Sequence, residues 1–307
     1  MEVNKTTKNT LYSRCKSSLP FLILESLRPQ QWTKNLFVFG AIVFSRNLLD
    51  ESLLLKTIFA FLIFSFLSGS VYILNDLYDI NEDRAHPVNS HRPLASSRLS
   101  VIQAIVAISL FIPFLLGLSY MINQSFFISA LCYILLQAAY TFYLKHVVIL
   151  DVFSTAFGFL LRVIAGAVAI QVEISSWLLI CTITLSLFLA LSKRRYEVAG
   201  LTAGEQRFRK VLQEYNTYLL DQMISVASSA TVVLYILYTL SDETLKRFGT
   251  RKLVYTVPPV LFGIFRYLYL IHKKKVGGNP ETTLFNDLPL FIGIIVWIAL
   301  VVLILYG

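Results

Sequence analysis

The chain has 307 residues, of which 56% are hydrophobic and only 15% are charged, and its formal net charge is +9. Soluble domains carry about 25% charged residues, so this composition excludes a water-soluble globular protein and predicts an integral membrane protein. The basic residues lie in loops between apolar stretches, which favours an anionic membrane surface over nucleic acid as the partner of the positive charge.

Nine apolar stretches follow one another along the chain, and most approach the roughly 20 residues that a transmembrane helix needs. They run over residues 35–49, 53–74, 101–121, 124–143, 152–170, 177–192, 218–240, 254–271 and 288–306. We therefore expect an all-α integral membrane protein with about nine transmembrane helices in one bundle.

Lysine and arginine residues concentrate in alternate loops, above all in the long polar loops 75–100 and 193–217. Because cytosolic loops carry an excess of these residues, we expect the N-terminus and both loops in the cytosol and the C-terminus outside. This is the orientation expected in a bacterial-type cytoplasmic (inner) membrane. We divide the chain into a cytosolic segment, 1–24, and a single transmembrane catalytic domain, 25–307.

An acidic segment follows directly after the second apolar stretch. It contains Asn75, Asp76, Asp79 and Asp83, and on a helix this spacing brings the three carboxylates to one face. They would repel one another there unless a cation lay between them. Mg²⁺ is commonly held by one or two carboxylates, with substrate phosphates completing its shell. The segment therefore predicts a magnesium–diphosphate site at the mouth of a helix bundle; the alternative is a solvated loop that happens to be acidic.

Two prolines in the same loop indicate where this helix ends. Pro87 and Pro93 would interrupt any helix, so we expect the carboxylates on the last turns of the second span. Arg92 lies beside Pro93, and its planar fork is suited to binding phosphate oxygens bidentately.

Polar residues also gather around the fourth and fifth spans. Tyr140 and Lys145 precede Asp151 and Arg162, which are eleven residues apart and so share a helical face. An arginine inside an apolar span is costly and by default marks a functional pocket. The alternative is a structural ion pair between Arg162 and Asp151 or another acid.

The sixth span ends in a charged group that contains Lys193, Arg194 and Glu197. Lys193 and Glu197 are four residues apart and share a face. This mixture of positively and negatively charged side chains favours binding of a phosphorylated sugar over binding of a bare metal ion. The alternative is that the basic residues only anchor the helix at the membrane surface.

Taken together, these strings resemble the UbiA-type superfamily of intramembrane prenyltransferases, and within it the decaprenyl-phosphate phosphoribosyltransferase family. The resemblance covers nearly the whole chain from about residue 25. The strings that carry it are Asn75-Asp76-x-x-Asp79-x-x-x-Asp83, Leu27-Arg28-Pro29-x-Gln31-Trp32, His86-Pro87 with Arg92-Pro93, Leu144-Lys145 with Asp151, Gly158 with Arg162 and Gly166, and Lys193-Arg194 with Glu197. The chain departs from the phosphoribosyl branch at Asn89, where that branch tends to have a lysine.

The resemblance implies transfer of a 5-phosphoribosyl group from phosphoribosyl pyrophosphate to a polyprenyl (decaprenyl-type) phosphate at the cytosolic mouth of the bundle, with release of diphosphate. It implies a Mg²⁺ cofactor, membrane lipid around the protein, a role in cell-wall biosynthesis and no nucleic-acid partner; a homo-oligomer is compatible with the sequence. Expected catalytic residues are Asp76, Asp79 and Asp83, which bind the metal, with Lys145 and Arg162. Expected substrate-binding residues are Asn75, Arg92, Tyr140, Asp151, Lys193, Arg194 and Glu197, where Glu197 either binds the ribose or orients Lys193.

Two alternatives remain at the level of sequence. A prenyltransferase that moves a prenyl group from prenyl diphosphate to an aromatic acceptor would keep Asp76 and Asp79, but members of that kind usually carry a second aspartate-rich motif after the sixth span, which this loop lacks. An arginine inside the membrane, such as Arg162, would also suit a transporter or flippase for a lipid phosphate.

Overall fold

The computed structural model describes residues 18–200, 210–274 and 280–307, and these ranges fold almost entirely into helices. Most of the expected cytosolic segment 1–24, and the middle of the loop 193–217, lie outside them. Within the described ranges, eight helices are long and apolar enough to cross a membrane, and they correspond to the second through ninth predicted spans.

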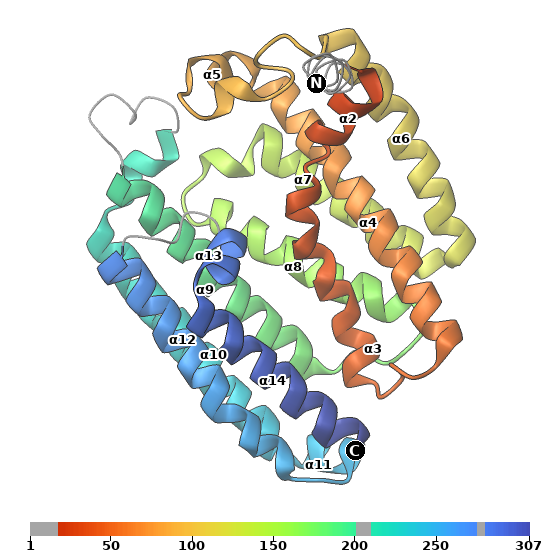
Figure 1. Cartoon of the computed structure of the whole chain (residues 1–307), viewed down its shortest axis with the longest axis vertical. Helices are drawn as coiled ribbons and strands as arrows, with labels where there is room; N and C mark the ends of the chain where they lie inside the picture. The colour runs from red at the N-terminus through yellow and green to blue at the C-terminus, as the bar shows by residue number, and fades with distance from the viewer. Residues whose placement is uncertain (1–17, 201–209, 275–279) are drawn as a thin grey trace, which may run out of the picture.

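The eight spans form one bundle in which neighbours in sequence mostly pack side by side (Figure 1). Their bounds are α4 (Glu51–Tyr78), α6 (Val101–Ile122), α7 (Gln124–Phe142), α8 (Leu150–Ala169), α9 (Ser176–Gly200), α10 (Thr217–Leu240), α12 (Val257–Tyr269) with its flanking turns η6 (Lys252–Thr256) and η7 (Leu270–Lys274), and α14 (Leu288–Tyr306). Short helices join them: α2 (Leu19–Ser26), α5 (Ile80–Ala85), η2 (Asn89–His91), η3 (Leu144–His146), η5 (Lys210–Glu214), α11 (Asp242–Phe248) and α13 (Pro280–Asn286).

The first predicted span, 35–49, is wrong in its bounds and in its helix type. The chain instead forms a 3₁₀-helix, η1 (Pro29–Phe39), followed by a short α-helix, α3 (Gly40–Phe44). A 3₁₀-helix rises about 2.0 Å per residue against 1.5 Å in an α-helix, so these two elements together extend about 30 Å. That length matches the hydrocarbon core of a bilayer. The segment runs beside α4 from the end of the bundle that carries α2 to the end that carries the C-terminus (Figure 1).

Two glycines let η1 and the turn before it lie directly against the bundle. A β-carbon on Gly69 of α4 would come within 2.7 Å of the Leu27 side chain, and one on Gly166 of α8 would overlap the carbonyl oxygen of Val38. Irregular backbone is tolerated in a membrane only where protein covers its polar groups. The close approach of α4 and α8 therefore allows a 3₁₀-helix to cross at this position.

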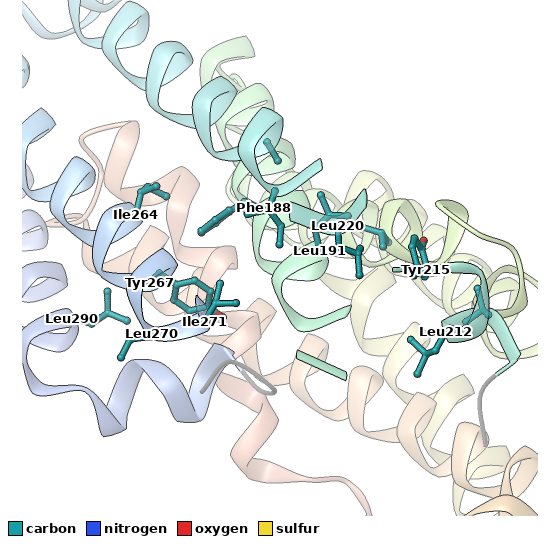
Figure 2. Packing of buried hydrophobic residues seen from close by; sticks show 14 residues of the cluster. Phe188, Leu191, Leu212, Tyr215, Leu220, Ile264, Tyr267, Leu270, Ile271 and Leu290 are labelled. Atoms are coloured by element: carbon teal, nitrogen blue, oxygen red, sulfur yellow. The ribbon is translucent and has the colours of Figure 1, made fainter. Parts of the chain in front are cut away.

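The core consists of two main clusters that share α8. One joins α4, α6, α7 and α8 around Phe64 and Phe126. The other joins α8, α9, α10, α12 and α14 around Phe188 and Tyr267, and it also holds Leu212 and Tyr215 from the loop before α10 (Figure 2). Since α8 contributes to both clusters, it fixes the position of the first half of the bundle relative to the second.

We predict that Gly166→Ala lowers the unfolding temperature of the purified protein in detergent by several degrees. The added methyl group cannot fit against the Val38 carbonyl, and overpacking of this kind costs about 1–3 kcal/mol. Gly117→Ala is the matched control, because nothing lies within 4 Å of the corresponding position on α6. Thermal unfolding of the two variants side by side is the measurement, and equal unfolding temperatures would contradict the proposed close packing.

Candidate functional site

The acidic segment lies on two helices that meet at Asp79. Asp76 belongs to the last turn of α4, Asp79 ends that helix with φ −93° and ψ 14°, and Asp83 lies in α5. The expectation that all three carboxylates share one face of a single helix is therefore wrong. The break at Asp79 turns α5 away from the axis of α4, and Asn75 holds the break by donating to the Asp79 carboxylate over 2.9 Å.

Each of the three carboxylates is paired with a cation that comes from elsewhere in the chain. Asp76, which is 2% exposed, accepts from Arg28 and, over 3.1 Å, from Arg92. The same Arg92 nitrogen donates to Asp83 over 2.6 Å. Two unit charges 4 Å apart interact by about 4 kcal/mol at an effective dielectric constant of 20, so the bridging guanidinium offsets a substantial repulsion between these carboxylates.

Lys145 completes the group from η3, the turn between α7 and α8. Its ammonium lies 2.5 Å from Asp79 and 4.7 Å from the centre of the Tyr78 ring. Asn89 also joins, donating to Asp83 over 2.8 Å. The residue at which this chain departs from the phosphoribosyl branch thus contacts a predicted metal ligand. We call Asp76, Asp79, Asp83, Arg28, Arg92 and Lys145 the mouth cluster.

Arg28 is the member of the mouth cluster that no sequence argument assigned to the site. It lies directly before Pro29, with φ 52° and ψ 66°, and its guanidinium stacks 4.9 Å from the Tyr72 ring centre. A signal was present in the sequence, since proline is favoured in the first turn of a helix and restricts the backbone of the residue before it. What the sequence could not show is that this turn aims the side chain at Asp76.

The donor chemistry of the mouth cluster fits a magnesium ion that binds together with a diphosphate. Among the residues that the structure describes, no three His, Cys, Asp or Glu side chains lie close enough to hold a metal by themselves. Mg²⁺, however, commonly uses only one or two carboxylates and completes its shell with substrate phosphates and water. Phosphate oxygens are equally good partners for Arg28, Arg92 and Lys145, so a diphosphate could accept these cations while the carboxylates bind the metal.

A second buried group surrounds Arg194 at the end of α9. Its Nε donates to Asp151 over 2.6 Å, one terminal nitrogen donates to Glu197, and the other lies 3.3 Å from the Tyr140 hydroxyl. Glu197 thus accepts a hydrogen bond from Arg194, and its predicted role in binding the ribose or orienting Lys193 stays a prediction. Because its guanidinium is buried and has three protein partners, Arg194 holds Asp151, Glu197 and Tyr140 together, and the half-buried Lys193 is the neighbouring cation.

Arg162 does not pair with Asp151, so that alternative is wrong. The two residues share a face, but eleven residues of helix separate them by about 16 Å along α8. Arg162, which is 4% exposed, donates to Asn35 over 2.6 Å, and to the Gly158 carbonyl and the Tyr133 hydroxyl over 2.8 Å each.

Asn35 in turn connects this arginine to the first long helix. It donates to Ser65 and Ser68 of α4 over 3.2 Å and 3.1 Å. The three acceptors of Arg162 are uncharged, and together these bonds tie η1, α4, α7 and α8 to one another. Arg162 therefore lies deeper in the bundle than the mouth cluster and connects its helices.

An apolar cavity of about 730 Å³ lies between η1–α3 on one side and α9, α10, α12 and α14 on the other. Toward the mouth its lining includes Lys34 and Phe285, the latter from α13. At the opposite end the Tyr306 hydroxyl donates to the Val43 carbonyl over 3.0 Å, which joins α14 to α3. The cavity thus runs along much of the bundle, and its apolar lining suits a hydrocarbon chain.

Residues 36–200 match the UbiA prenyltransferase family. The chain is 31% identical over 287 residues to a decaprenyl-phosphate phosphoribosyltransferase of Mycolicibacterium smegmatis, and this match covers 90% of each chain. It is 29% identical over 290 residues to a decaprenyl-phosphate phosphoribosyltransferase of Corynebacterium glutamicum, which covers 92% of this chain and 86% of that one.

Among solved structures, a UbiA homolog from Archaeoglobus fulgidus bound to GPP and Mg²⁺ matches with a TM-score of 0.71 at 20% identity, over 93% of this chain and 100% of that chain. This likeness confirms the expected all-α membrane fold.

We predict that Arg162→Lys lowers the unfolding temperature in detergent by several degrees. Lysine keeps the charge but cannot reach three acceptors with a planar fork, and each buried acceptor left without a donor costs about 1–3 kcal/mol. The control is Arg84→Lys, because Arg84 is exposed and its bonds to Ala95 and Ser97 are both 3.4 Å long. If the two variants unfold at the temperature of the unmodified protein, Arg162 does not connect the helices in this way.

Proposed function

The chain belongs to the UbiA prenyltransferase family of membrane enzymes, and from this premise we propose that it transfers a 5-phosphoribosyl group from phosphoribosyl pyrophosphate to a polyprenyl phosphate, releasing diphosphate. The observation that carries the proposal is that one bundle holds both the mouth cluster and a long apolar cavity. The cluster suits an anionic, soluble donor with a diphosphate group. The cavity suits the tail of a lipid acceptor.

The relatives named as decaprenyl-phosphate phosphoribosyltransferases support this choice of donor and acceptor, since the similarity extends over nearly the full length of both chains. The loop after α9 supports it as well, because residues 193–217 contain no aspartate and place Arg194 and Glu197 beside Asp151. An enzyme that transfers prenyl groups to aromatic acceptors would be expected to carry a second acidic cluster there.

The proposed roles follow from the contacts. Asp76, Asp79 and Asp83 would hold Mg²⁺, which when bound neutralises negative charge on the leaving diphosphate. Arg28 and Arg92 would bind phosphate oxygens through their planar forks.

The remaining polar residues of this end would serve the sugar and the acceptor. Lys145 would place its ammonium against the phosphates, and Asn75 would hold Asp79 in position. Lys193, Glu197 and Tyr140 lie on or beside the Arg194 group, where the sugar and its 5-phosphate would bind.

The chemical step does not require a general base. An oxygen of the lipid phosphate forms a bond to the anomeric carbon of the ribose, and the bond from that carbon to the diphosphate oxygen breaks. The attacking phosphate is already ionised, so no proton has to be removed. What the protein contributes is the alignment of the two substrates and the stabilisation of charge on the departing diphosphate.

We place the mouth cluster on the cytosolic side of a bacterial-type cytoplasmic membrane. The loops at this end of the bundle are rich in lysine and arginine, and the donor is a soluble anion. Because α2 and the C-terminus lie at opposite ends of the bundle, the C-terminus is then outside (Figure 1).

The test is a transfer assay with purified protein, labelled phosphoribosyl pyrophosphate, a polyprenyl phosphate and Mg²⁺. Label that enters the lipid phase, and fails to enter when a chelator is present, supports the proposal. Absence of label from a folded preparation contradicts it, and prenyl diphosphate with aromatic acceptors is then the next pair of substrates. A lipid-phosphate transporter would release no diphosphate in either assay.

We predict that Asp76→Asn lowers turnover by at least about 100-fold without unfolding the protein. The substitution removes a charged ligand near the diphosphate, and loss of several kcal/mol of charge stabilisation corresponds to this factor. Glu82→Gln is the matched control, because Glu82 is an exposed acid on the adjacent helix α5. The measurement is the initial rate of both variants at saturating Mg²⁺. Near-normal turnover by the Asp76 variant would contradict the proposal that Asp76 is a Mg²⁺ ligand.

A further inference from the structure

The turn that leads into α8 contains a strained residue. Ile149, the residue before the helix begins, has φ 71° and ψ −45°. A β-branched side chain at positive φ is a genuine outlier, and these angles lie near those of the strained γ-turn. Such a conformation persists only when the surrounding structure over-determines it, so the contacts of Ile149 identify what holds it.

Tyr215, from the loop that precedes α10, supplies those contacts. Its hydroxyl accepts from the Ile149 backbone N–H over 2.7 Å and donates to the Asp151 carboxylate over 2.8 Å. Burial raises the pKa of the Tyr215 phenol above its ordinary value, which keeps the donating proton in place. One hydroxyl thus bonds both the strained residue and the first turn of α8.

The Tyr215 ring is itself firmly placed. It is buried in the cluster that Figure 2 shows, with Leu212 and Leu220 from the same part of the chain, and Val148 and Val152 from either side of Ile149 pack against that cluster. The short helices η3 and η5 are also in contact. The turn before α8 is therefore held against the second half of the bundle.

Lys145 lies in η3, four residues before Ile149, and its ammonium is 2.5 Å from Asp79 in the mouth cluster. The path of the backbone between the two residues sets where this ammonium lies. We propose that Tyr215 is a positioning residue, which holds the strained turn at Ile149 and thereby fixes Lys145 against the diphosphate site. This inference rests on the proposed function in one respect, namely that Lys145 lies beside a bound diphosphate.

The test compares Tyr215→Phe with Tyr218→Phe. The first removes the hydroxyl and keeps the buried ring, while Tyr218 is 71% exposed and lies in the first turn of α10. We expect kcat to fall about 10-fold or more for the Tyr215 variant and less than 2-fold for the Tyr218 variant, because two hydrogen bonds to the turn are lost in the first case only.

A rescue variant separates positioning from a general loss of structure. Glycine adopts positive φ without strain, so in an Ile149→Gly background the turn needs less support. We expect Tyr215→Phe to lower kcat by less than 3-fold in that background. An equal fold-loss with and without Ile149→Gly would mean that Tyr215 acts independently of the strained turn, and would overturn the proposal.

Amide hydrogen exchange supplies a readout that needs no substrate. We expect exchange of the Ile149 amide to be at least 10-fold faster in Tyr215→Phe than in the unmodified protein or in Tyr218→Phe. Unchanged exchange overturns the anchoring role, and faster exchange with unchanged turnover overturns the positioning of Lys145. If phosphoribosyl transfer itself fails, the exchange result still stands and the rates are measured with prenyl diphosphate as donor.

Discussion

The carboxylates of Asp76, Asp79 and Asp83 are paired with cations that come from three other parts of the chain. Arg28 comes from the turn before η1, Arg92 from the loop after α5, and Lys145 from the turn before α8. A buried charge without a partner would cost several kcal/mol, so the mouth cluster requires these segments to converge. The arrangement of the first half of the bundle and the composition of the site thus follow from the same requirement for charge compensation.

This requirement also connects the resting protein to its proposed chemistry. The carboxylates and cations that pair with each other in the structure are the two kinds of group that a metal-bound diphosphate needs, one kind for the metal and the other for the phosphates. Binding of the donor would exchange one set of ionic partners for another of similar strength. Little uncompensated charge would have to be buried in either state.

Much of the architecture could be predicted from hydropathy alone, since seven of the eight long helices begin within two residues of their predicted spans. The first crossing could not, because an apolar stretch does not indicate whether the chain winds as a 3₁₀-helix or as an α-helix. The spacing of Asp76, Asp79 and Asp83 indicated a site, but spacing alone does not show that the helix breaks at Asp79. The partner of Arg162 was missed because a shared helical face says nothing about separation along the axis. Tyr215 could not be found at all, since its two bonds join residues more than sixty positions away.

The 3₁₀ winding of η1 determines which of its side chains face the bundle and which face the cavity. With three residues per turn, side chains at every third position line up in straight rows, so η1 and the start of α3 have three edges. Asn35, Val38 and Ala41 form the edge that is buried against α4 and α8, whereas Leu36 and Phe39, with Phe37 and Gly40, line the cavity. Insertion or loss of a single residue near its start would turn every following edge by a third of a rotation and bring the cavity-lining Phe37 or Phe39 into the place of Val38 on the buried edge. Substitutions that keep this register can therefore reshape the cavity without disturbing the buried edge, whereas a change of length alters both at once.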